Sequence, residues 1–460
     1  MVVQRRVAVI GAGPAGIHAA AALAEHGVAV DLFDSLPTPY GLVRYGTAPD
    51  HRRIKEIVVA LRQALDRSGI RFFGNVDYGR DLKLAELRRS CHAVIFATGA
   101  AVDRPLPIPG IDLPGSFGAA DFVAWYNGHP DAPRDWPLAA REVAVIGAGN
   151  VALDVARMLA KPAAEQLITE MPDNVWQGLV ANRARDIHLF ARRGPAQVKF
   201  TPLELRELAE SPSVAVVVHP EGAELTPEDE AMIKRSRQRR TVVRTLLDWI
   251  EQGSSLGADG GESEPGSERR RIHLHFRAAP VAVLGAGAVT GLRTERTTPD
   301  GDIDGDMITG TGEFADWPVQ AVYRAIGYRS VPVPGIPFDE STGTVPHRAG
   351  RVVDLDGSVV AGVYVTGWIK RGPVGLIGHT KSDAAETVAS VLADLDRLPA
   401  PEVPDPGETK RMLREKGVDF TTLADWDRLD AHEISLGRAR GRDRIKVVAR
   451  DTMIKLGRNP

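Results

Sequence analysis

The chain has 460 residues, and its 57 Lys and Arg against 60 Asp and Glu leave a formal net charge of -3. This near-neutral balance disfavours wholesale nucleic-acid binding, so any basic partner surface must be local. The single cysteine, Cys91, excludes an internal disulfide, a CxxC dithiol and a cysteine-ligated iron–sulfur cluster on this chain. The length predicts about three domains, or two large interleaved ones.

Neither a membrane span nor a secretion signal is expected. No run of residues approaches the roughly 18 apolar residues of a transmembrane helix. Basic residues followed by an apolar stretch near the start superficially match a signal peptide, but Gly11, Gly13, Pro14 and Gly16 interrupt the apolar helix. We therefore expect a cytoplasmic protein.

The first motif is a glycine-rich turn between a strand predicted over 7–10 and a helix predicted over 17–26. Gly11, Gly13 and Gly16 allow a tight turn, a close backbone approach to a pyrophosphate, and packing of helix on strand. The helix N-terminus offers free N–H groups to the phosphate. The next strand ends at Asp34, which suits the adenosine ribose of FAD and rejects a 2′-phosphate. The alternative is a purely structural glycine turn.

The same pattern recurs after a strand predicted over 143–146, where Gly147 opens a second glycine-rich turn. The strand expected to close this second unit, over 186–190, ends without an acid and is followed by Arg192 and Arg193. Guanidinium groups at this place favour a 2′-phosphate, so the second site is predicted to prefer NADP over NAD. The alternative is a pair of solvated arginines. Two unlike sites in one chain allow hydride to pass between the two cofactors.

Further segments support this layout. Strands predicted over 93–99 and 321–327 end in small or glycine turns, where crossovers between two nucleotide-binding domains would lie. A third strand, over 363–368, leads into the glycine-rich segment 372–378, where backbone N–H groups can approach a ring system. The alternative there is a plain strand–turn–helix.

Two polar segments punctuate the chain. Residues 251–271 have few apolar side chains and are predicted to form a mobile loop. A proline-rich stretch over 398–407 opens a tail of about 50 residues. The apolar positions of that tail suggest docking on the body: Leu423, Trp426, Leu429 and Ile434.

Taken together, these motifs and their order resemble the bacterial adrenodoxin reductase-like ferredoxin–NADP reductases over roughly residues 5–395. The resemblance is carried by LPTPYGLVR (36–44), APDH (48–51), RFFGN (71–75), GAGNVALDVAR (147–157), RRGP (192–195), LELREL (203–208) and GWIKRGP (367–373). It implies an α/β fold with two Rossmann-like, three-layer dinucleotide-binding domains. Its implied boundaries are an FAD domain over 1–104 and 331–399, an NADP domain inserted over 105–330, and a C-terminal extension over 400–460.

The resemblance also implies individual cofactor contacts. Those for FAD are Ala15, Asp34, Leu42, Tyr78, Trp368, Gly375, Leu376 and Ile377. Those for NADP are Arg104, Ala148, Gly149, Asn150, Val151, Arg192, Arg193 and Glu204, with Gly375 near the nicotinamide. No metal site is predicted.

His51 and Glu207 match the polar pair that the family places beside the flavin. A histidine there can exchange protons or fix water near a reduced flavin. Hydride transfer itself needs no protein acid, so we expect the pair to tune the reaction rather than enable it. Without the resemblance, His51 is more often a loop histidine, and Glu207 more often lies on a solvated helix face.

The missing cysteines bear on the electron acceptor. Flavin accepts a hydride as two electrons and can release them singly, but this chain has no disulfide and no cysteine cluster to receive them. A separate acidic ferredoxin would need a basic docking face, and residues 231–247 carry six basic side chains and no acid. If this segment is helical, Met232, Val243, Leu246 and Ile250 share one face, and Arg237, Arg240 and Arg244 another.

The docking assignment has two alternatives: a merely solvated helix face, and a competing basic stretch over 438–446. The leading hypothesis for function is an FAD-dependent ferredoxin–NADP(+) reductase, which takes hydride from NADPH and passes single electrons to a ferredoxin that can feed a cytochrome P450. The alternatives are the flavoprotein subunit of a larger glutamate synthase-like oxidoreductase, and a redox-sensing NADP-binding protein without turnover.

Overall fold

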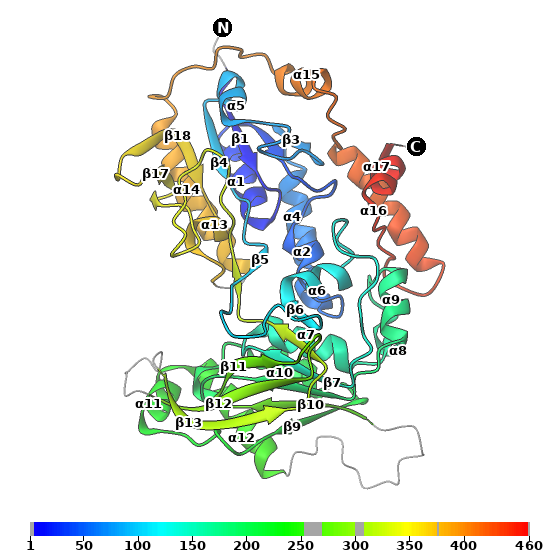
Figure 1. The fold of residues 1–460 in the computed structure, drawn as a ribbon. Coiled ribbons are helices and arrows are strands. Elements are labelled where there is room, and N and C mark those ends of the chain that lie inside the picture. Colours follow the sequence, from blue (N-terminus) through cyan, green and yellow to red (C-terminus); the bar gives the residue numbers. More distant parts are fainter. Residues whose placement is uncertain (1–3, 253–268, 300–307, 375–376, 459–460) are drawn as a thin grey trace.

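The computed structural model describes residues 4–252, 269–299, 308–374 and 377–458. Most of the predicted loop 251–271 lies outside these ranges, as do Gly375 and Leu376. The described chain forms two bodies, each built around a mainly parallel sheet (Figure 1). We call them the first body and the second body in the order in which the chain enters them.

The first body contains a sheet of seven strands in the order β16-β17-β18-β4-β1-β2-β3, in which the pairs β16–β17 and β17–β18 are antiparallel and all other neighbours are parallel. Both ends of the chain supply it. The strands are β1 (Arg6–Ile10), β2 (Ala29–Phe33), β3 (Ile70–Phe73), β4 (Ala93–Phe96), β16 (His347–Arg348), β17 (Arg351–Val353) and β18 (Val359–Val365).

Helices cover both faces of this sheet because its strands alternate buried apolar side chains between the two faces. On β1, Val7 and Val9 join the core under α1 (Pro14–Glu25), α4 (Ile57–Leu65) and α14 (Thr380–Asp394). Ala8 and Ile10 join the opposite core, which α5 (Leu84–Ser90) and α15 (Glu408–Glu415) close. The first body therefore has three layers.

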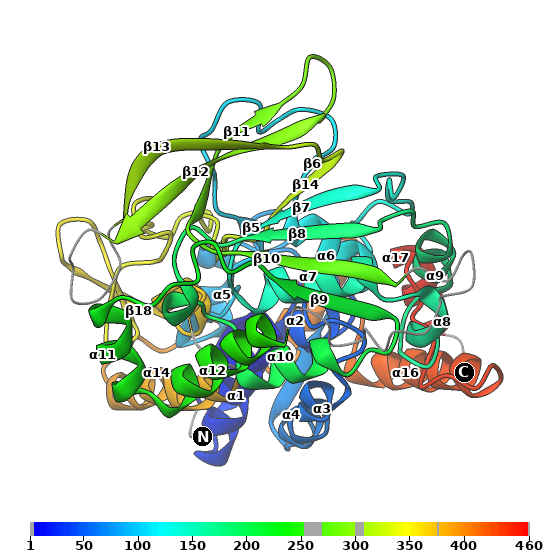
Figure 2. The same ribbon diagram turned by 90° about the horizontal axis from the view of Figure 1, so that it is seen from below.

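The second body contains six parallel strands in the order β6-β14-β7-β8-β10-β9. Helices cover one face, and a three-stranded antiparallel sheet covers the other (Figure 2). The parallel strands are β6 (Ser116–Gly118), β7 (Glu142–Ile146), β8 (Asp186–Phe190), β9 (Val214–Val218), β10 (Arg270–His275) and β14 (Ala321–Arg324). The covering elements are α6 (Ala119–Tyr126), α7 (Asn150–Ala160), α10 (Pro202–Ala209), α12 (Arg237–Glu251), β11 (Ala278–Leu284), β12 (Gly291–Pro299) and β13 (Ile308–Trp317).

Two short strands join the bodies. The chain leaves the first body through β5 (Val102–Asp103) and returns through β15 (Tyr328–Arg329), which pair antiparallel with Tyr328 opposite Asp103. The Arg104 N–H donates to the Gly327 carbonyl at 2.9 Å. The two crossovers thus follow β4 and β14, the strands that the sequence predicts at 93–99 and 321–327.

The basic segment after residue 230 is not one helix. It is divided between α11 (Pro227–Arg235) and α12, because Ser236 adopts extended backbone and its Oγ caps α12 by accepting from the Arg239 N–H at 3.3 Å. The expected apolar face is correspondingly changed: on α12 it consists of Val242, Val243, Leu246 and Trp249.

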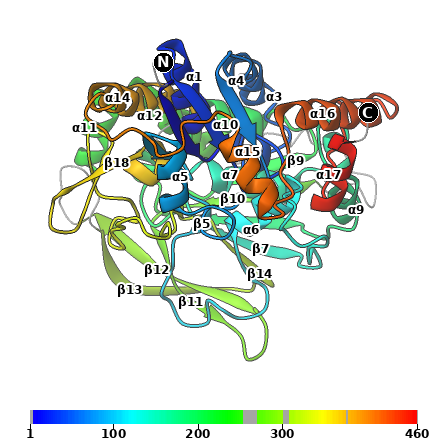
Figure 3. The ribbon, with the colours of Figure 1, turned by 90° about the horizontal axis from the view of Figure 1, so that it is seen from above.

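The remaining helices belong to one of the two bodies or to the tail. They are α2 (Leu42–Tyr45), α3 (Arg52–Lys55), α8 (Ala163–Gln166), α9 (Asp173–Val180), α13 (Trp368–Arg371), α16 (Leu423–Arg438) and α17 (Arg450–Arg458), with the 3-10 turns η1 (Pro195–Gln197) and η2 (Ile377–His379). Trp426 and Leu429 of α16 are buried in the core of the first body, and α16 and α17 lie on the same side of the molecule as α9 of the second body (Figures 1 and 3). None of the helices in the described ranges is long and apolar enough to cross a bilayer.

Candidate dinucleotide and redox site

The first glycine turn lies at the carboxyl end of β1. Gly11 has φ +108°, and a Cβ there would lie 2.4 Å from the Ala97 carbonyl oxygen; a Cβ on Gly16 would lie 1.8 Å from the Gly11 oxygen. Packing of the chain itself therefore requires both glycines. A Cβ on Gly13, the N-cap of α1, would meet nothing within 4 Å. That open position at a helix N-terminus fits an approaching pyrophosphate.

Asp34, which follows β2, stabilises this turn through backbone hydrogen bonds. Its Oδ2 accepts from the Ala12 N–H at 2.7 Å, and its Oδ1 accepts from the Leu36 N–H at 2.9 Å. Burial raises the pKa of Asp34 to about 6, although both backbone hydrogen bonds lower it. Each carboxylate oxygen keeps a second lone pair that a ribose hydroxyl can use. The Tyr40 N–H donates to the Ala12 carbonyl at 2.8 Å and so brings Leu42 to the same place.

The second glycine turn follows β7 and repeats this geometry. Gly147 has φ +144°, and a Cβ there would lie 2.3 Å from the Ala325 carbonyl oxygen at the end of β14. Gly149, the N-cap of α7, again has open space where a Cβ would be. The Lys199 N–H donates to the Ala148 carbonyl at 2.8 Å, so a second loop supports the turn. This turn also fits a pyrophosphate.

Arg192 and Arg193 follow β8 at the carboxyl edge of the same sheet, the first exposed and the second partly exposed. Neighbouring strands hold their backbone: Thr297 Oγ1 donates to the Arg192 carbonyl at 2.7 Å, and the Arg277 N–H donates to the Arg193 carbonyl at 3.1 Å. The arrangement suits a 2′-phosphate near the adenosine end of a dinucleotide on Gly149.

Other predicted contacts lie around these turns. Trp368 begins α13 directly after Gly367, where a Cβ would lie 2.7 Å from Ala15 Cβ, so α13 starts against α1. The Tyr78 hydroxyl donates to the Pro334 carbonyl at 3.2 Å, and its ring meets Phe96 edge to face. Asn150 Oδ1 accepts from the Thr201 N–H, Val151 lies in the first turn of α7, and Ile377 begins η2. Gly375 and Leu376 fall outside the described ranges.

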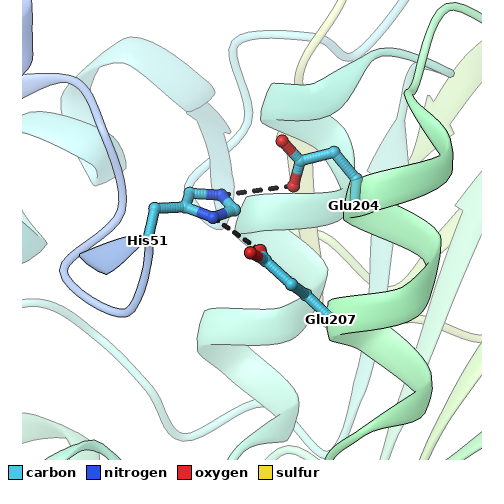
Figure 4. A group of neighbouring side chains, drawn as sticks. All are labelled: His51, Glu204 and Glu207. Atoms are coloured by element: carbon cyan, nitrogen blue, oxygen red, sulfur yellow. Dashed lines mark ion pairs between the residues drawn. The ribbon is translucent and has the colours of Figure 1, made fainter. Parts of the chain in front are cut away.

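His51 and Glu207, from different bodies, are in direct contact (Figure 4). His51 precedes α3 in the first body, and Glu204 and Glu207 lie on α10 of the second. His51 Nδ1 is 2.6 Å from Glu207 Oε2, and Nε2 is 3.2 Å from Glu204 Oε2 and 2.7 Å from Asp154 Oδ1. Glu204, predicted to contact NADP, thus also faces His51.

The carboxylates set the charge of His51. Burial by itself lowers the pKa of the imidazole, but the contacts with Asp154, Glu204 and Glu207 outweigh it and raise the pKa to about 11. The ring is therefore protonated at neutral pH, so it is a proton donor to its surroundings and not a base.

Arg157 of α7 is a second buried cation in this cluster. Its Nε and Nη2 donate to Asp50 at 2.8 and 3.0 Å, and Nη2 also lies 2.8 Å from Asp154 Oδ1. Lys161 donates to the same Asp50 at 2.9 Å. Arg157 with Lys161 lowers the pKa of Asp50 well below its usual range despite burial.

Asp50, Asp154 and Arg157 did not emerge as site residues from sequence reasoning. Asp50 lies in the 48–51 stretch and the other two in the 147–157 stretch that carry the resemblance, and Asp154 and Arg157 are charged residues buried within a mainly apolar helix. A charge buried on a helix that follows a dinucleotide turn requires a partner, and the partner lies about 100 residues away in the chain.

The cluster is an ion-pair network and not a metal site. Ligand atoms of His51, Glu204 and Glu207 lie within 4.8 Å of one another. However, the two carboxylates face different ring nitrogens, and Arg157 Nη2 lies 2.8 Å from His51 Nε2. One ion could not bind both ring nitrogens, and it would meet the guanidinium.

Cys91 takes no part in either site. It is buried directly after the last residue of α5, and burial raises the pKa of its thiol to about 12. A thiol with so high a pKa is a poor nucleophile and does not supply disulfide chemistry.

Comparisons with known proteins agree with this geometry. The family model described as pyridine nucleotide-disulphide oxidoreductase matches residues 5–190. NADPH-ferredoxin reductase FprA of Mycobacterium leprae is 38% identical over 465 residues, covering 98% of each chain. Human mitochondrial NADPH:adrenodoxin oxidoreductase is 36% identical, covering 98% of this chain and 91% of its own length. The structure of Mycobacterium tuberculosis FprA in complex with NADPH superimposes with a TM-score of 0.86 at 35% identity, covering 99% of this chain and all of that one.

Proposed function

The chain belongs to the family of NADPH-ferredoxin reductases and NADPH:adrenodoxin oxidoreductases, and on that premise we propose how its residues perform an FAD-dependent ferredoxin–NADP(+) reductase reaction. The cofactors are FAD and NADP. Bound FAD accepts a hydride from NADPH and releases single electrons to a ferredoxin. The observation that carries the proposal is the pair of open glycine turns, one beside Asp34 and the other beside Arg192 and Arg193.

The first body binds FAD and the second binds NADP, with boundaries at 1–104 and 331–399 for the first, 105–330 for the second, and 400–460 for the extension. The antiparallel pair of β5 and β15 supports these boundaries, because it lies between the two sheets. The absence of a usable dithiol distinguishes this chain from a disulfide reductase, and the acceptor is a separate protein.

His51 and Glu207 act beside the flavin by holding a proton and fixing the approach of the two bodies. The support is their contact across the bodies together with a pKa of about 11 for His51. An imidazole that is charged at neutral pH stabilises negative charge developing nearby. It is not needed for hydride transfer, so we expect tuning of the rate and not its loss.

The arginine pair after β8 selects NADPH. In the variant with Arg192→Gln and Arg193→Gln, the kcat/KM for NADPH should fall at least about 100-fold while that for NADH changes little, because two charge-assisted contacts to the 2′-phosphate are lost. The test is steady-state reduction of ferricyanide with each nucleotide. A parent enzyme that uses NADH as readily as NADPH would overturn the assignment.

Ferredoxin docks on the exposed face of α12, through Arg237, Arg240 and Arg244. All three are exposed, while α12 packs on the body through its apolar side. The competing basic stretch of the tail is less available, because Arg442 and Lys446 are buried and form internal contacts. An acidic iron–sulfur protein fits such a face.

Charge reversal tests this docking face. Reversing Arg237, Arg240 and Arg244 to Glu should raise the KM for an acidic ferredoxin by at least about tenfold and leave ferricyanide reduction unchanged. The matched control reverses Arg88 and Arg89, which are exposed on α5 of the other body. If the α12 variant and the α5 control raised the KM for ferredoxin equally, the α12 face would not be the docking site.

The reductase acts in the cytoplasm. The stretch that superficially resembles a signal peptide is occupied by β1 and α1, the first strand and helix of the dinucleotide fold. Cell fractionation with an antibody to the native protein tests this location.

A further inference from the structure

We propose that residues 433–450 of the C-terminal extension clamp the two bodies in the orientation that hydride transfer requires, with Lys446 and Arg450 as positioning residues. The inference rests on the proposed function, since donor and acceptor of the hydride are assigned to different bodies. Single side chains of the extension bond both bodies.

Lys446 is the centre of this clamp. Its side chain is fully buried, and Nζ donates to the Arg44 carbonyl of the first body at 2.7 Å. It also donates to the Asn127 carbonyl of the second body at 3.2 Å and lies 2.7 Å from Glu170 Oε1 of that body. Burial lowers the pKa of Lys446 well below its usual value, although Glu170 opposes this shift. Whether the nitrogen is charged or neutral, a change in the angle between the bodies would leave a buried polar group without part of its hydrogen bonding, which costs free energy.

Arg450 makes the second link. Its Nη1 donates to the Ser35 carbonyl and to Asn75 Oδ1 of the first body, both at 2.7 Å. Its Nη2 donates to both oxygens of Asp131 in the second body, at 2.9 and 2.8 Å. Ser35 directly follows Asp34, so this link begins beside the first dinucleotide turn.

A third set of contacts ties the clamp to the other side of that turn. Arg44 of α2 donates to both oxygens of Glu433, at 2.9 and 2.5 Å, and all of these groups are buried. Glu433 Oε1 also accepts from the Val447 N–H at 2.9 Å. Trp426 meets the ring of Tyr40, which has the strained φ of +83°, edge to face. The tail therefore fixes the 40–44 loop as well as the second body.

The consequence for the reaction is geometric. Hydride transfer needs the donor and acceptor atoms of the two cofactors about 3–3.5 Å apart, and an error of 1 Å costs about 100-fold in rate. Because the two cofactors sit on different sheets, the angle between the bodies determines that distance. A loosened clamp should slow the transfer without weakening the binding of either cofactor.

Four variants of the holoenzyme test the clamp: Lys446→Met, Arg450→Met, Arg450→Lys, and the control Lys455→Met, whose side chain is exposed on α17 of the same tail. Stopped-flow absorbance gives the rate constant of flavin reduction at saturating NADPH. It should fall at least tenfold in both Met variants, with the Kd for NADPH and the FAD content unchanged. Arg450→Lys should recover part of the rate, and Lys455→Met should match the parent. If Lys446→Met does not fold, Arg450→Met, at a partly exposed side chain, carries the test.

A second readout is independent of turnover. Spin labels on Leu355→Cys in the first body and Phe314→Cys in the second report the distance between the bodies, because both positions are exposed and Cys91 is buried. The parent should give one narrow distance distribution, and Lys446→Met or Arg450→Met a broad one. Unchanged distributions together with unchanged rates would overturn the clamp. If the parent showed no reduction by NADPH, the proposed function would fail, and the distances alone would decide the clamp.

Discussion

Arg157 balances the buried carboxylates between the two bodies, since it contacts both Asp50 and Asp154 with a side chain that has no exposed surface. In Arg157→Met these two carboxylates lose their main counter-charge inside the protein. Breaking a buried pair by removing one partner costs about 3–5 kcal/mol. We therefore expect a loss of this size in the free energy of unfolding, measured by urea denaturation of the holoprotein. Arg206→Met, at an exposed position of α10, is the control and should change the stability little.

The raised pKa of His51 gives a pH dependence of stability. A folded-state pKa of about 11 against an unfolded value of 6.5 means that the stabilisation is complete below pH 6.5 and is lost as the pH rises toward 11. Between pH 7 and pH 10 the free energy of unfolding of the parent should fall by at most about 4 kcal/mol more than that of His51→Gln, because glutamine does not titrate. Urea unfolding at each pH measures the difference. Parallel pH profiles for the two proteins would show that His51 is not held charged by its carboxylates.

At the scale of elements, the glycine that opens each turn and the glycine at the N-cap of the following helix have separable roles. Gly147→Ala forces a side chain onto a backbone of φ +144° and against the Ala325 carbonyl, so it should destabilise the fold by roughly 1–3 kcal/mol. Gly149→Ala meets no atom of the protein, so its melting temperature should stay close to that of the parent. It should nevertheless raise the Kd for NADPH at least about tenfold, because the methyl group takes the space of a phosphate. Thermal melts and a fluorescence titration with NADPH separate the two effects.

A stack of histidines between the sheets of the second body predicts acid sensitivity. His188, His273 and His275 lie on β8 and β10, and the centroid of the His275 ring lies 4.5 Å from that of Trp317 of β13, with the two rings tilted. Burial, followed by mutual repulsion among the histidines, lowers the pKa of His275 to about 2. Its neutral form is therefore the stabilised one, and stability is lost as the pH falls below 6.5.

His275→Phe should remove this sensitivity, since a phenyl ring can keep the stacking with Phe190. Between pH 6.5 and pH 5, the free energy of unfolding should fall by about 1.5 kcal/mol more in the parent than in the variant. The comparison needs only unfolding curves at the two pH values. An equal loss of unfolding free energy in both proteins would mean that protonation of His275 is not what destabilises the fold in acid.

At the scale of the whole molecule, what the sequence predicts depends on how local the interactions are. The turns at Gly11 and Gly147 and the residues after β2 and β8 lie within single βαβ units, so motif and spacing suffice to predict them. Arg157 could not be predicted as a site residue, because Asp50 belongs to the other body and Glu204 lies 47 residues away in the chain. Lys446 and Arg44 are likewise 402 residues apart, and only the structure brings them together.

The division of the basic segment at Ser236 shows a second reason why a sequence pattern can fail to predict helix boundaries. The sequence pattern of apolar and basic residues continues across the break, so periodicity alone predicts one helix. The capping hydroxyl of Ser236 decides the local structure, and it gives a weaker sequence signal than the charges around it. The exposed positions of Arg237, Arg240 and Arg244 are unaffected, because all three lie on α12.

The most direct test of the whole account is an anaerobic stopped-flow experiment on the FAD-loaded protein. NADPH should bleach the flavin absorbance in one rapid phase, and NADH should do so at least about 100-fold less efficiently. Addition of an oxidised acidic ferredoxin should then restore the flavin spectrum and yield two reduced ferredoxins per NADPH. Equal bleaching by NADH, or a reduced flavin that no ferredoxin reoxidises, would contradict the account.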